Sequence, residues 1–376
     1  MKVEGFIFLI VFCFVLASAC AAPTPTTTPQ TTLPQPTLTL TVTATTSATP
    51  ERRPTPTASP TPEYLSELRF PAQSLVHDLR WSPDGSLFAV SAGTEIHLYN
   101  AASLEEQYNL SLGLWAGRIA FHPSEPILAA TSKDGRIRFW KSANGDEMCT
   151  FVAHRKGANS LAFQPEPSGA TAGRNAGLLA TTGAEIISRL WNISTVVEGG
   201  CNVSERANLI GNSFTAPAIA FSADGEQLAV VDIRNIFLHQ ARTRKLITIL
   251  ESELSVFDIA LSADGHWLAA AHENATVALW DLTDQPNPTA TTLRLPATKP
   301  KTYAWRVAFS SDGSLLAAGT SEGALLVWAL PELEPVFRRN LPQAISALDF
   351  KPQTHLFAAG SLDGSVHIYA PDGSRP

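Results

Sequence analysis

One phrase recurs seven times between residues 64 and 376, and it constrains the fold more than any other feature. It consists of an apolar run ending in a large residue, then Ser-x-Asp-Gly, then a run such as Leu-Ala-Ala. The clearest copies, DLRWSPDGSLFAV, AIAFSADGEQLAV, DIALSADGHWLAA and RVAFSSDGSLLAA, begin at Asp78, Ala218, Asp258 and Arg306. Weaker copies begin at Arg118, Ser160 and Ala347. Self-similarity at periods of about 20–50 residues is typical of solenoids and propellers.

The residues between these phrases predict four strands in each copy. Short runs alternate apolar and polar residues and end at turn residues, as half-buried strands do. In SKDGRIRFW and SLDGSVHIY, which begin at Ser132 and Ser361, Asp-Gly stands between two such runs and favours a hairpin. Four antiparallel strands repeated about every 45 residues are typical of a propeller blade. The sequence therefore predicts an all-β fold, a seven-bladed β-propeller of four-stranded antiparallel blades over 64–376, with small Ala residues between the blades.

Landmark residues in the copies resemble those of the WD-repeat family. Four strands end in Trp at Trp140, Trp191, Trp280 and Trp328, and the third of these forms a Trp-Asp pair with Asp281. Ala153-His154 stands where the family carries Gly-His, nine residues before a strand end. The resemblance covers about 310 of the 376 residues. It implies a WD40-repeat β-propeller whose loops and rims bind partner proteins, which is an inference from the fold rather than from a site.

The family's His–Ser/Thr–Asp–Trp hydrogen-bond network is expected to be incomplete in every copy. His154 has no Asp in its own second hairpin, where Gly183–Glu185 stands. Asp134 and Asp363 have no His in their copies. This departure puts the stability of single blades in doubt more than it puts the fold in doubt.

Residues 1–20 resemble the export signal of a bacterial lipoprotein. Lys2 opens a weakly charged segment, an apolar run follows from Phe6 to Leu16, and small residues precede Cys20. The resemblance to a lipobox implies that Cys20 is lipidated and becomes the mature N-terminus. An ordinary cleaved signal peptide and an uncleaved anchor are the alternatives. All three place the rest of the chain outside the cytoplasm, and the first places the propeller in the cell envelope on a lipid anchor.

Residues 21–62 predict a disordered stalk. Thr and Pro make up 26 of these 42 residues, and the segment contains no aromatic residue. Such a composition buries too little apolar surface to offset the entropy of ordering. Extended polyproline II structure, at about 3.1 Å per residue, would let it reach roughly 100 Å. The sequence leaves open whether the stalk is glycosylated.

Composition and motif context exclude several function classes. A net charge of −7 without Lys/Arg clusters argues against nucleic-acid binding. Gly319–Gly323 reads GTSEG and matches a nucleophile motif, but it falls in a turn between strands rather than between a strand and a helix. The nine His show no metal-binding spacing, and each Ser-x-Asp-Gly copy offers one carboxylate, too few for calcium. We therefore expect a non-enzymatic protein without metal or cofactor.

Two cysteines belong to the repeats, Cys149 and Cys201. An exported chain permits a disulfide. The two residues occupy outer-strand regions of adjacent copies, so we expect them to lie farther apart than the roughly 4.4–6.8 Å between Cα atoms that a bridge requires.

The last copy predicts how the ring closes. Too few residues follow Tyr369 for a fourth strand, whereas Tyr64–Phe70 alternates and belongs to no complete copy. We expect this segment to supply the outer strand of blade seven and to protect its edge.

Extended connections predict one candidate binding face. Glu166–Ala176 and Asn192–Gly200 lengthen the first and third connections of blade three, and Asp281–Ala290 lengthens a connection of blade five. First and third connections share a face in a four-stranded blade, so these loops should crowd there. Long loops are often functional.

The opposite face, where each first strand begins, is the preferred site. There an apolar or small residue precedes a side chain that should point to the mouth of the central channel. The candidate partner-binding residues are His77, Trp115, Phe257 and Trp305, and Phe257 and Trp305 are expected to form one patch. Exposed aromatic rings are frequent interface anchors. Packing of the same rings against neighbouring loops is the alternative.

Three functions remain open from the sequence. The leading hypothesis is a membrane-tethered extracytoplasmic scaffold that binds protein partners of unknown identity. The second is a ligand-binding or enzymatic propeller with a site at the channel mouth, which needs several titratable side chains converging on one pocket. The third is a structural subunit of an envelope complex.

Overall fold

The computed structural model describes residues 64–71, 74–165, 177–185, 187–209, 217–283 and 288–371. All of them belong to the compact unit Ala58–Pro376. The signal segment 1–20 with Cys20, the segment 21–62 and the insertion Glu166–Ala176 lie outside the described residues. Among the residues described, no helix is long and apolar enough to span a membrane.

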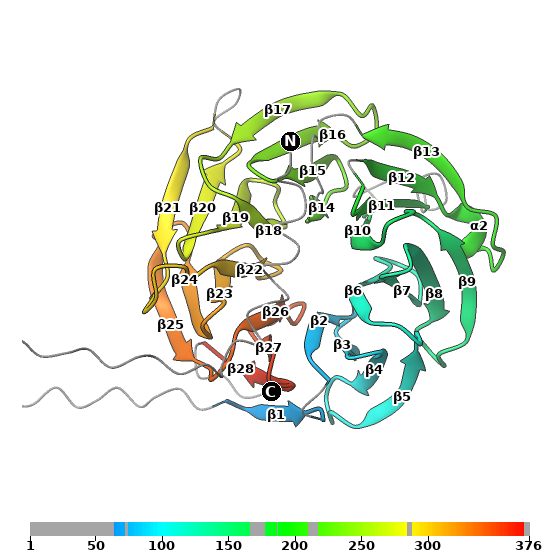
Figure 1. Ribbon diagram of the computed structural model, residues 1–376, viewed down its shortest axis with the longest axis horizontal. Coiled ribbons are helices and arrows are strands. Elements are labelled where there is room, and N and C mark those ends of the chain that lie inside the picture. Colours follow the sequence, from blue (N-terminus) through cyan, green and yellow to red (C-terminus); the bar gives the residue numbers. More distant parts are fainter. Residues whose placement is uncertain are drawn as a thin grey trace, which may run out of the picture. The chain divides into compact units, whose positions relative to one another are not determined.

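Seven sheets of four antiparallel strands surround a central axis, which confirms the predicted seven-bladed propeller (Figure 1). The first strand of each blade lies innermost: β2 (Val76–Trp81), β6 (Ala116–Phe121), β10 (Ala158–Phe163), β14 (Ile219–Phe221), β18 (Val256–Leu261), β22 (Ala304–Phe309) and β26 (Ile345–Phe350). The second strands are β3 (Leu87–Ala92), β7 (Ile127–Ser132), β11 (Leu178–Gly183), β15 (Gln227–Asp232), β19 (Trp267–His272), β23 (Leu315–Thr320) and β27 (Phe357–Ser361).

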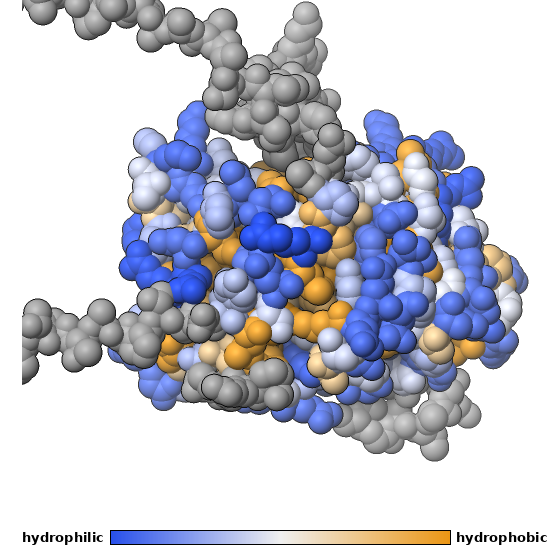
Figure 2. All heavy atoms as spheres, turned by 90° about the horizontal axis from the view of Figure 1, so that it is seen from below, coloured by the Kyte–Doolittle hydropathy of each residue, from blue (hydrophilic) through white to orange (hydrophobic). Residues whose placement is uncertain are grey.

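The remaining strands complete each blade toward the rim. The third strands are β4 (Glu95–Asn100), β8 (Arg136–Lys141), β12 (Ser188–Asn192), β16 (Asn235–Gln240), β20 (Thr276–Asp281), β24 (Ala324–Ala329) and β28 (Ser365–Tyr369). The outer strands are β5 (Glu106–Ser111), β9 (Glu147–Val152), β13 (Ser204–Leu209), β17 (Leu246–Glu251), β21 (Ala290–Arg294), β25 (Glu334–Asn340) and β1 (Ser66–Arg69). Figure 2 views this rim from one side, where polar residues cover most of the surface and apolar residues form separate patches.

The Ser-x-Asp-Gly phrases form the turns between first and second strands, as predicted. In blade one the Ser82 hydroxyl donates to Asp84 Oδ1 at 2.5 Å, and Asp84 accepts the backbone N–H of Ser86 at 3.1 Å. Gly85 has a φ of +69°, a conformation that favours glycine. Asp224, Asp264 and Asp312 accept the equivalent Ser hydroxyls in three other blades. These carboxylates are therefore occupied by their own turns.

Small residues of the second strands let adjacent blades pack closely. Ala89, Ala269 and Ala317 are fully buried, as the sequence predicted. At the last two blade boundaries the requirement is stricter. A Cβ atom on Gly319 would come within 2.4 Å of the Ile345 side chain, and one on Gly360 within 2.6 Å of Val76 Cγ1. Glycine is thus the residue that fits beside the first strand of the next blade at these two places.

Blade three holds most of the WD-type network. His154 Nε2 lies 2.9 Å from Thr181 Oγ1, which also accepts the Trp191 Nε1–H at 2.8 Å. Arg189 donates to His154 Nδ1 at 2.9 Å, so Nε2 carries the proton and donates to Thr181. Burial and the Arg189 charge lower the pKa of His154 to about 4. The Asp is absent, as predicted, and Glu185 lies 3.9 Å from Nδ1 and pairs with Arg189 at 2.9 Å.

The expectation that Cys149 and Cys201 lie too far apart is wrong. They form a disulfide, with Cα atoms 5.2 Å apart. Cys149 is buried in β9, whereas Cys201 lies in the connection that follows β12. Part of the Asn192–Gly200 extension is not a plain loop but the short helix α2 (Ser194–Val197). Thr195 bonds the backbone of Asn202 in both directions, and so the added residues carry Cys201 to the neighbouring blade.

β1 closes the ring as the outer strand of blade seven, which confirms the prediction for Tyr64–Phe70. It pairs antiparallel with β28, with Ser66 opposite Ile368 and Arg69 opposite Ser365. The Phe70 N–H also donates to the Gly364 carbonyl at 2.8 Å. The two ends of the repeat region are thereby joined in one sheet.

Deleting Tyr64–Phe70 should lower the melting temperature markedly, because it exposes the edge of β28 and opens the last blade. Deleting Ala21–Thr55 should leave the melting temperature nearly unchanged, because that segment lies outside the repeats. Thermal unfolding followed by circular dichroism makes the comparison. Equal effects of the two deletions would contradict the closure.

Candidate functional site at the channel mouth

A backbone irregularity positions three of the four predicted partner-binding residues. The ladder between first and second strands shifts register at His77 in β2, at Phe257 in β18 and at Trp305 in β22. Each of these residues is the extra residue of a β-bulge, which bends a strand and re-aims a side chain. All three are half-buried, whereas the residues before them, Val76, Val256 and Ala304, are buried. The three side chains are therefore neither core nor fully solvated.

His77 and Trp115 form one group on blades one and two. Their ring centroids lie 5.1 Å apart, and the Lys133 ammonium lies 4.2 Å from the centroid of the Trp115 ring. Trp115 is 38% exposed. Burial, and then the charges of Lys133 and Arg306, lower the pKa of His77 to about 4. His77 is therefore neutral near pH 7, and the group carries positive charge from Lys133 beside two exposed or half-exposed rings.

Phe257 forms a second group on blades five and six, but with a partner that the sequence analysis missed. Its ring packs edge-on against Tyr303, with centroids 5.3 Å apart. Within the described part of the chain, no ring contact joins Phe257 to Trp305. Tyr303 precedes β22, and its backbone N–H donates to Ser321 Oγ at 3.0 Å. The ring that packs against Phe257 is thus Tyr303 rather than Trp305, which lies two residues later at the start of β22.

Behind the mouth, the first strands bring six charged side chains together around the axis. Their members are Asp78, Arg80, Arg118, Asp258, Arg306 and Asp349, which we call the channel cluster. Arg118 makes the central contact, because its Nη2 lies 2.8 Å from Asp258 Oδ1 and its Nη1 lies 3.6 Å from Asp78. Arg118 belongs to blade two and Asp258 to blade five, so this ion pair spans the channel between blades that are not neighbours.

Hydrogen bonds tie the carboxylates of the channel cluster to neighbouring strands. Asp78 accepts the backbone N–H of Ile119 at 3.0 Å, and Asp349 accepts that of Trp81 at 2.8 Å. Each bond crosses from one blade to the next. The cluster therefore stabilises contacts between blades as well as across the axis, and it leaves its carboxylates engaged.

Three members of the channel cluster have shifted pKa values, and in Arg80 the neighbouring charges of Asp78 and Asp349 raise the pKa despite burial. Burial raises the pKa of Asp349 to about 6, although Arg80 and the Trp81 N–H favour its charged form. Burial and the charge of Arg118 lower the pKa of Arg306 to about 10. The pKa of Asp349 is higher in the folded protein than in the unfolded chain. The contribution of this group to stability is therefore lost as the pH rises from the pKa of the unfolded chain toward 6.

The channel cluster was not predicted, although the sequence contains a signal for it. The signal lies at two positions near the end of the first strand in each copy. The position three residues before the strand end is occupied by Asp78, Arg118, Ser160, Ala218, Asp258, Arg306 and Ala347. The position one residue before the strand end is occupied by Arg80, Ala120, Ala162, Ala220, Ala260, Ala308 and Asp349. These two positions share a strand face, so in a closed ring they must converge on the axis. Arg and Asp residues at these two positions, among otherwise small residues, predict that the opposite charges pair with each other.

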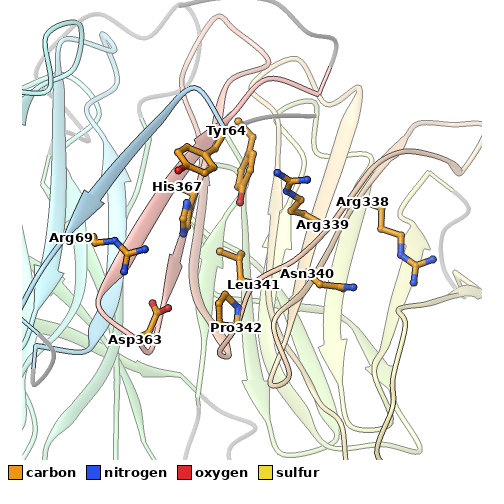
Figure 3. Close-up of a pocket in the computed structure, with 10 residues that line it drawn as sticks. Tyr64, Arg69, Arg338, Arg339, Asn340, Leu341, Pro342, Asp363 and His367 are labelled. Carbon is orange, nitrogen blue, oxygen red and sulfur yellow. The ribbon is translucent and has the colours of Figure 1, made fainter. Parts of the chain in front are cut away.

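A polar groove lies on the rim where β1 closes blade seven. It has a volume of about 520 Å³, and it lies between β1 and β28 on one side and β25 on the other. Figure 3 shows Tyr64 and His367 between Arg69 and Arg339. His367 is 8% exposed, and its Nδ1 has no hydrogen-bond partner in the described structure. Arg69 pairs with Glu67 at 2.6 Å. The groove is also lined by Arg338 and Arg339 and by the carboxylate of Asp363.

The nucleophile-like motif lies in the turn between β23 and β24, as predicted from its context. Ser321 Oγ accepts the Tyr303 N–H at 3.0 Å, and the Gly323 N–H donates to the Thr320 carbonyl at 3.2 Å. Among the residues that the structure describes, no group of three His, Cys, Asp or Glu side chains is placed to hold a metal ion.

The ion pair across the axis makes a stability prediction. Arg118→Met should lower the free energy of unfolding by about 3 kcal/mol, because it removes the ion-pair partner of the buried Asp258 and one of the two guanidinium groups beside the buried Asp78. Asp258→Asn should lower the free energy of unfolding by less, because Arg118 still has the Asp78 carboxylate as a counter-charge. The double variant Arg118→Met/Asp258→Asn should be more stable than Arg118→Met alone. Denaturant unfolding of all four proteins tests this, and strictly additive losses would contradict the coupling.

Comparison with known proteins agrees with this geometry. The profile of the family "WD domain, G-beta repeat" matches residues 117–141, 244–281, 295–329 and 335–370. The chain is 23% identical over 261 residues to "Target of rapamycin complex subunit wat1" of Schizosaccharomyces pombe, which covers 67% of this chain and 77% of that protein.

Two shorter matches carry higher identity. A "Protein LST8 homolog" of Drosophila pseudoobscura pseudoobscura is 34% identical over 98 residues, 25% of this chain and 31% of that protein. "Small ribosomal subunit protein RACK1y" of Oryza sativa subsp. japonica is 28% identical over 152 residues, 38% of this chain and 43% of that protein. The chain thus matches less than half the length of either. The four matched segments are similar to the WD domain, G-beta repeat family, and all of them lie within the seven-bladed propeller.

Proposed function

We propose that this protein is a membrane-tethered, extracytoplasmic WD40 scaffold that binds a protein partner at the channel mouth. The observation that carries the proposal is the placement of His77, Phe257 and Trp305 on β-bulges, half-exposed, at one face of the propeller. Rings held in this way bury a large area on binding at little entropic cost. Trp115 and Tyr303 extend the same face.

The charges at the mouth favour a particular kind of partner segment. Lys133 stands over Trp115, and Arg306 lies behind His77. His77 is neutral, so the positive charge comes from side chains that stay ionised at neutral pH. A loop that carries acidic and aromatic side chains would match both the charges and the rings. Two relatives are named as a complex subunit and a ribosomal subunit protein, which agrees with assembly into larger complexes.

A non-enzymatic role fits the channel cluster better than catalysis does. The raised pKa of Asp349 is of a kind found at catalytic sites. However, Asp349 accepts the Trp81 N–H and Asp258 is paired with Arg118 at 2.8 Å, so the carboxylates are used within the cluster. The Arg118–Asp258 pair also crosses the space that a substrate would need. The alternatives, a ligand-binding or enzymatic propeller and a structural envelope subunit, predict different cross-linked species.

The proposed localisation rests on the sequence alone. Small residues before Cys20, the apolar run Phe6 to Leu16 and the Thr/Pro-rich segment 21–62 together support a lipid anchor and a stalk. A disulfide between Cys149 and Cys201 is compatible with an oxidising compartment. We propose no nucleic-acid partner and no cofactor.

Replacing both Phe257 and Trp305 by Ala should weaken partner binding by at least ~2 kcal/mol, roughly 30-fold, and leave the fold intact. Cross-linking on intact cells, followed by quantitative recovery of the partner, measures the loss. The matched control is Val152→Ala/Val336→Ala, which removes exposed apolar side chains from the rim strands β9 and β25. Unchanged recovery together with a lower melting temperature would show that the rings are core and the site lies elsewhere.

Cys20→Ser should abolish fatty-acid labelling of the protein and release it from the membrane fraction, because the thiol is the proposed point of lipidation. Cys13→Ser, which changes a cysteine inside the apolar run, should change neither. Metabolic labelling and membrane fractionation test both variants. An uncleaved anchor would give a different result. The unaltered protein would then take up no fatty-acid label, and the Cys20→Ser variant would stay in the membrane fraction.

A further inference from the structure

Blade six breaks the repeat at one position of its outer strand. In every blade, one outer-strand residue pairs with the third strand three residues before the large residue near the end of that strand. In six blades this outer-strand residue is apolar: Leu110, Phe151, Leu209, Leu250, Leu293 and Leu68. In blade six it is the half-buried Arg339, which pairs with Leu325. A charged residue at a position built for packing is a departure expected at functional sites.

Arg339 lines the polar groove between blades six and seven. Figure 3 shows its side chain directed toward Tyr64, whose ring packs edge-on against His367 with centroids 5.1 Å apart. Arg339 hydrogen-bonds the Tyr369 hydroxyl, which uses one of the five N–H donors of the guanidinium group. Among the residues that the structure describes, no carboxylate forms an ion pair with Arg339. The hydroxyl satisfies a donor but leaves the charge of Arg339 without a counter-charge.

The two carboxylates closest to this groove are engaged elsewhere. Glu67 pairs with Arg69 at 2.6 Å. Asp363 Oδ1 accepts the backbone N–H of Ser365 at 2.9 Å and the Ser365 hydroxyl at 2.6 Å. The carboxylates therefore neutralise Arg69 and hold the turn before β28, and the positive charge of Arg339 favours an anionic ligand.

His367 adds an unsatisfied hydrogen-bond acceptor to the same groove. The Ser365 hydroxyl gives its single proton to Asp363, so its oxygen accepts the Nε2–H of His367 at 3.1 Å. Burial lowers the pKa of His367, so the ring is neutral near pH 7 and Nδ1 carries no proton. Nδ1 is buried without a hydrogen-bond partner in the described structure, and the residue is 8% exposed. A ligand that supplies an N–H or O–H would remove the cost of this buried acceptor.

We propose that the groove binds an extended acidic segment of a partner protein, with a carboxylate on Arg339 and a backbone N–H on His367 Nδ1. A peptide brings both groups together, and its aliphatic carbon atoms match Tyr64, Leu341 and Pro342 in the lining. The volume of about 520 Å³ is in the range of ligand pockets and much larger than a single anion needs. Recognition of acidic segments by arginine is a recurring mode of peptide binding. The groove lies on the rim and is a second docking surface beside the channel mouth.

Selection of a random-peptide display library on the immobilised full chain tests the proposal. The wild-type chain should enrich peptides that carry Asp or Glu, and Arg339→Leu should weaken their binding at least about tenfold, because a hydrogen-bonded charge is lost. Arg339→Leu should not lower the melting temperature, because Leu stands at this position in five other blades. Arg294→Leu, which removes an exposed guanidinium group from β21, is the matched control and should bind as the wild type does. A selection without any acidic peptide that depends on Arg339 would overturn the proposal.

Two variants of His367 test the second contact with the selected peptide. His367→Gln keeps a donor for Ser365 but removes the Nδ1 acceptor, so it should weaken binding. His367→Asn, whose amide oxygen can take the place of Nδ1, should recover part of the affinity. Fluorescence anisotropy measures each dissociation constant, and the peptide with Asn and Gln in place of Asp and Glu should bind at least about tenfold more weakly. Unchanged binding by His367→Gln, or equal binding of inorganic phosphate and the peptide in competition, would contradict a peptide site.

Discussion

Contacts between neighbouring blades support everything else in this propeller, because no blade buries both of its faces alone. Each second strand presents small residues to the first strand of the next blade. At the junction of blades seven and one, Gly360 leaves room for Val76, and Phe70, Val76 and Val366 share one apolar cluster. That junction joins residues about 290 positions apart in the chain, and β1 holds it shut by pairing with β28. A ring that depends on every neighbour is stable only when the last neighbour is present.

The closed ring also explains why charged residues can occupy the axis. First strands from different blades bring Arg118 and Asp258 within 2.8 Å, although 140 residues separate them. The ion pair and the cross-blade bonds of Asp78 and Asp349 engage these side chains within the channel, although Asp78 Oδ1 has only ion-pair contacts and no hydrogen bond in the described structure. The mouth in front of the cluster is left to aromatic side chains on bulges. The paired charges and the half-buried rings are thus adjacent on the same strands but have different surroundings.

Repetition made most of this fold predictable, whereas single exceptions to the repeat were not. Blade number, strand order, the Ser-x-Asp-Gly turns and the role of Tyr64–Phe70 follow from comparing copies with each other. The Cys149–Cys201 bridge was missed because the helix α2 and its connection break the plan of blade three. Tyr303 was missed because it lies outside the strand. The channel cluster was not predicted because equivalent positions of different blades come together only when the ring is closed.

The central claim is that the face around Trp115, His77, Phe257 and Trp305 meets a protein partner, and site-specific photo-cross-linking tests it most directly. A photoreactive residue placed at Trp115, which is 38% exposed at the mouth, is compared on intact cells with one at Val152, which is 52% exposed on the outer strand β9. The account predicts one reproducible protein cross-linked from position 115 and none of it from position 152. The same partner captured only from position 152 would contradict the account and move the binding site to the rim.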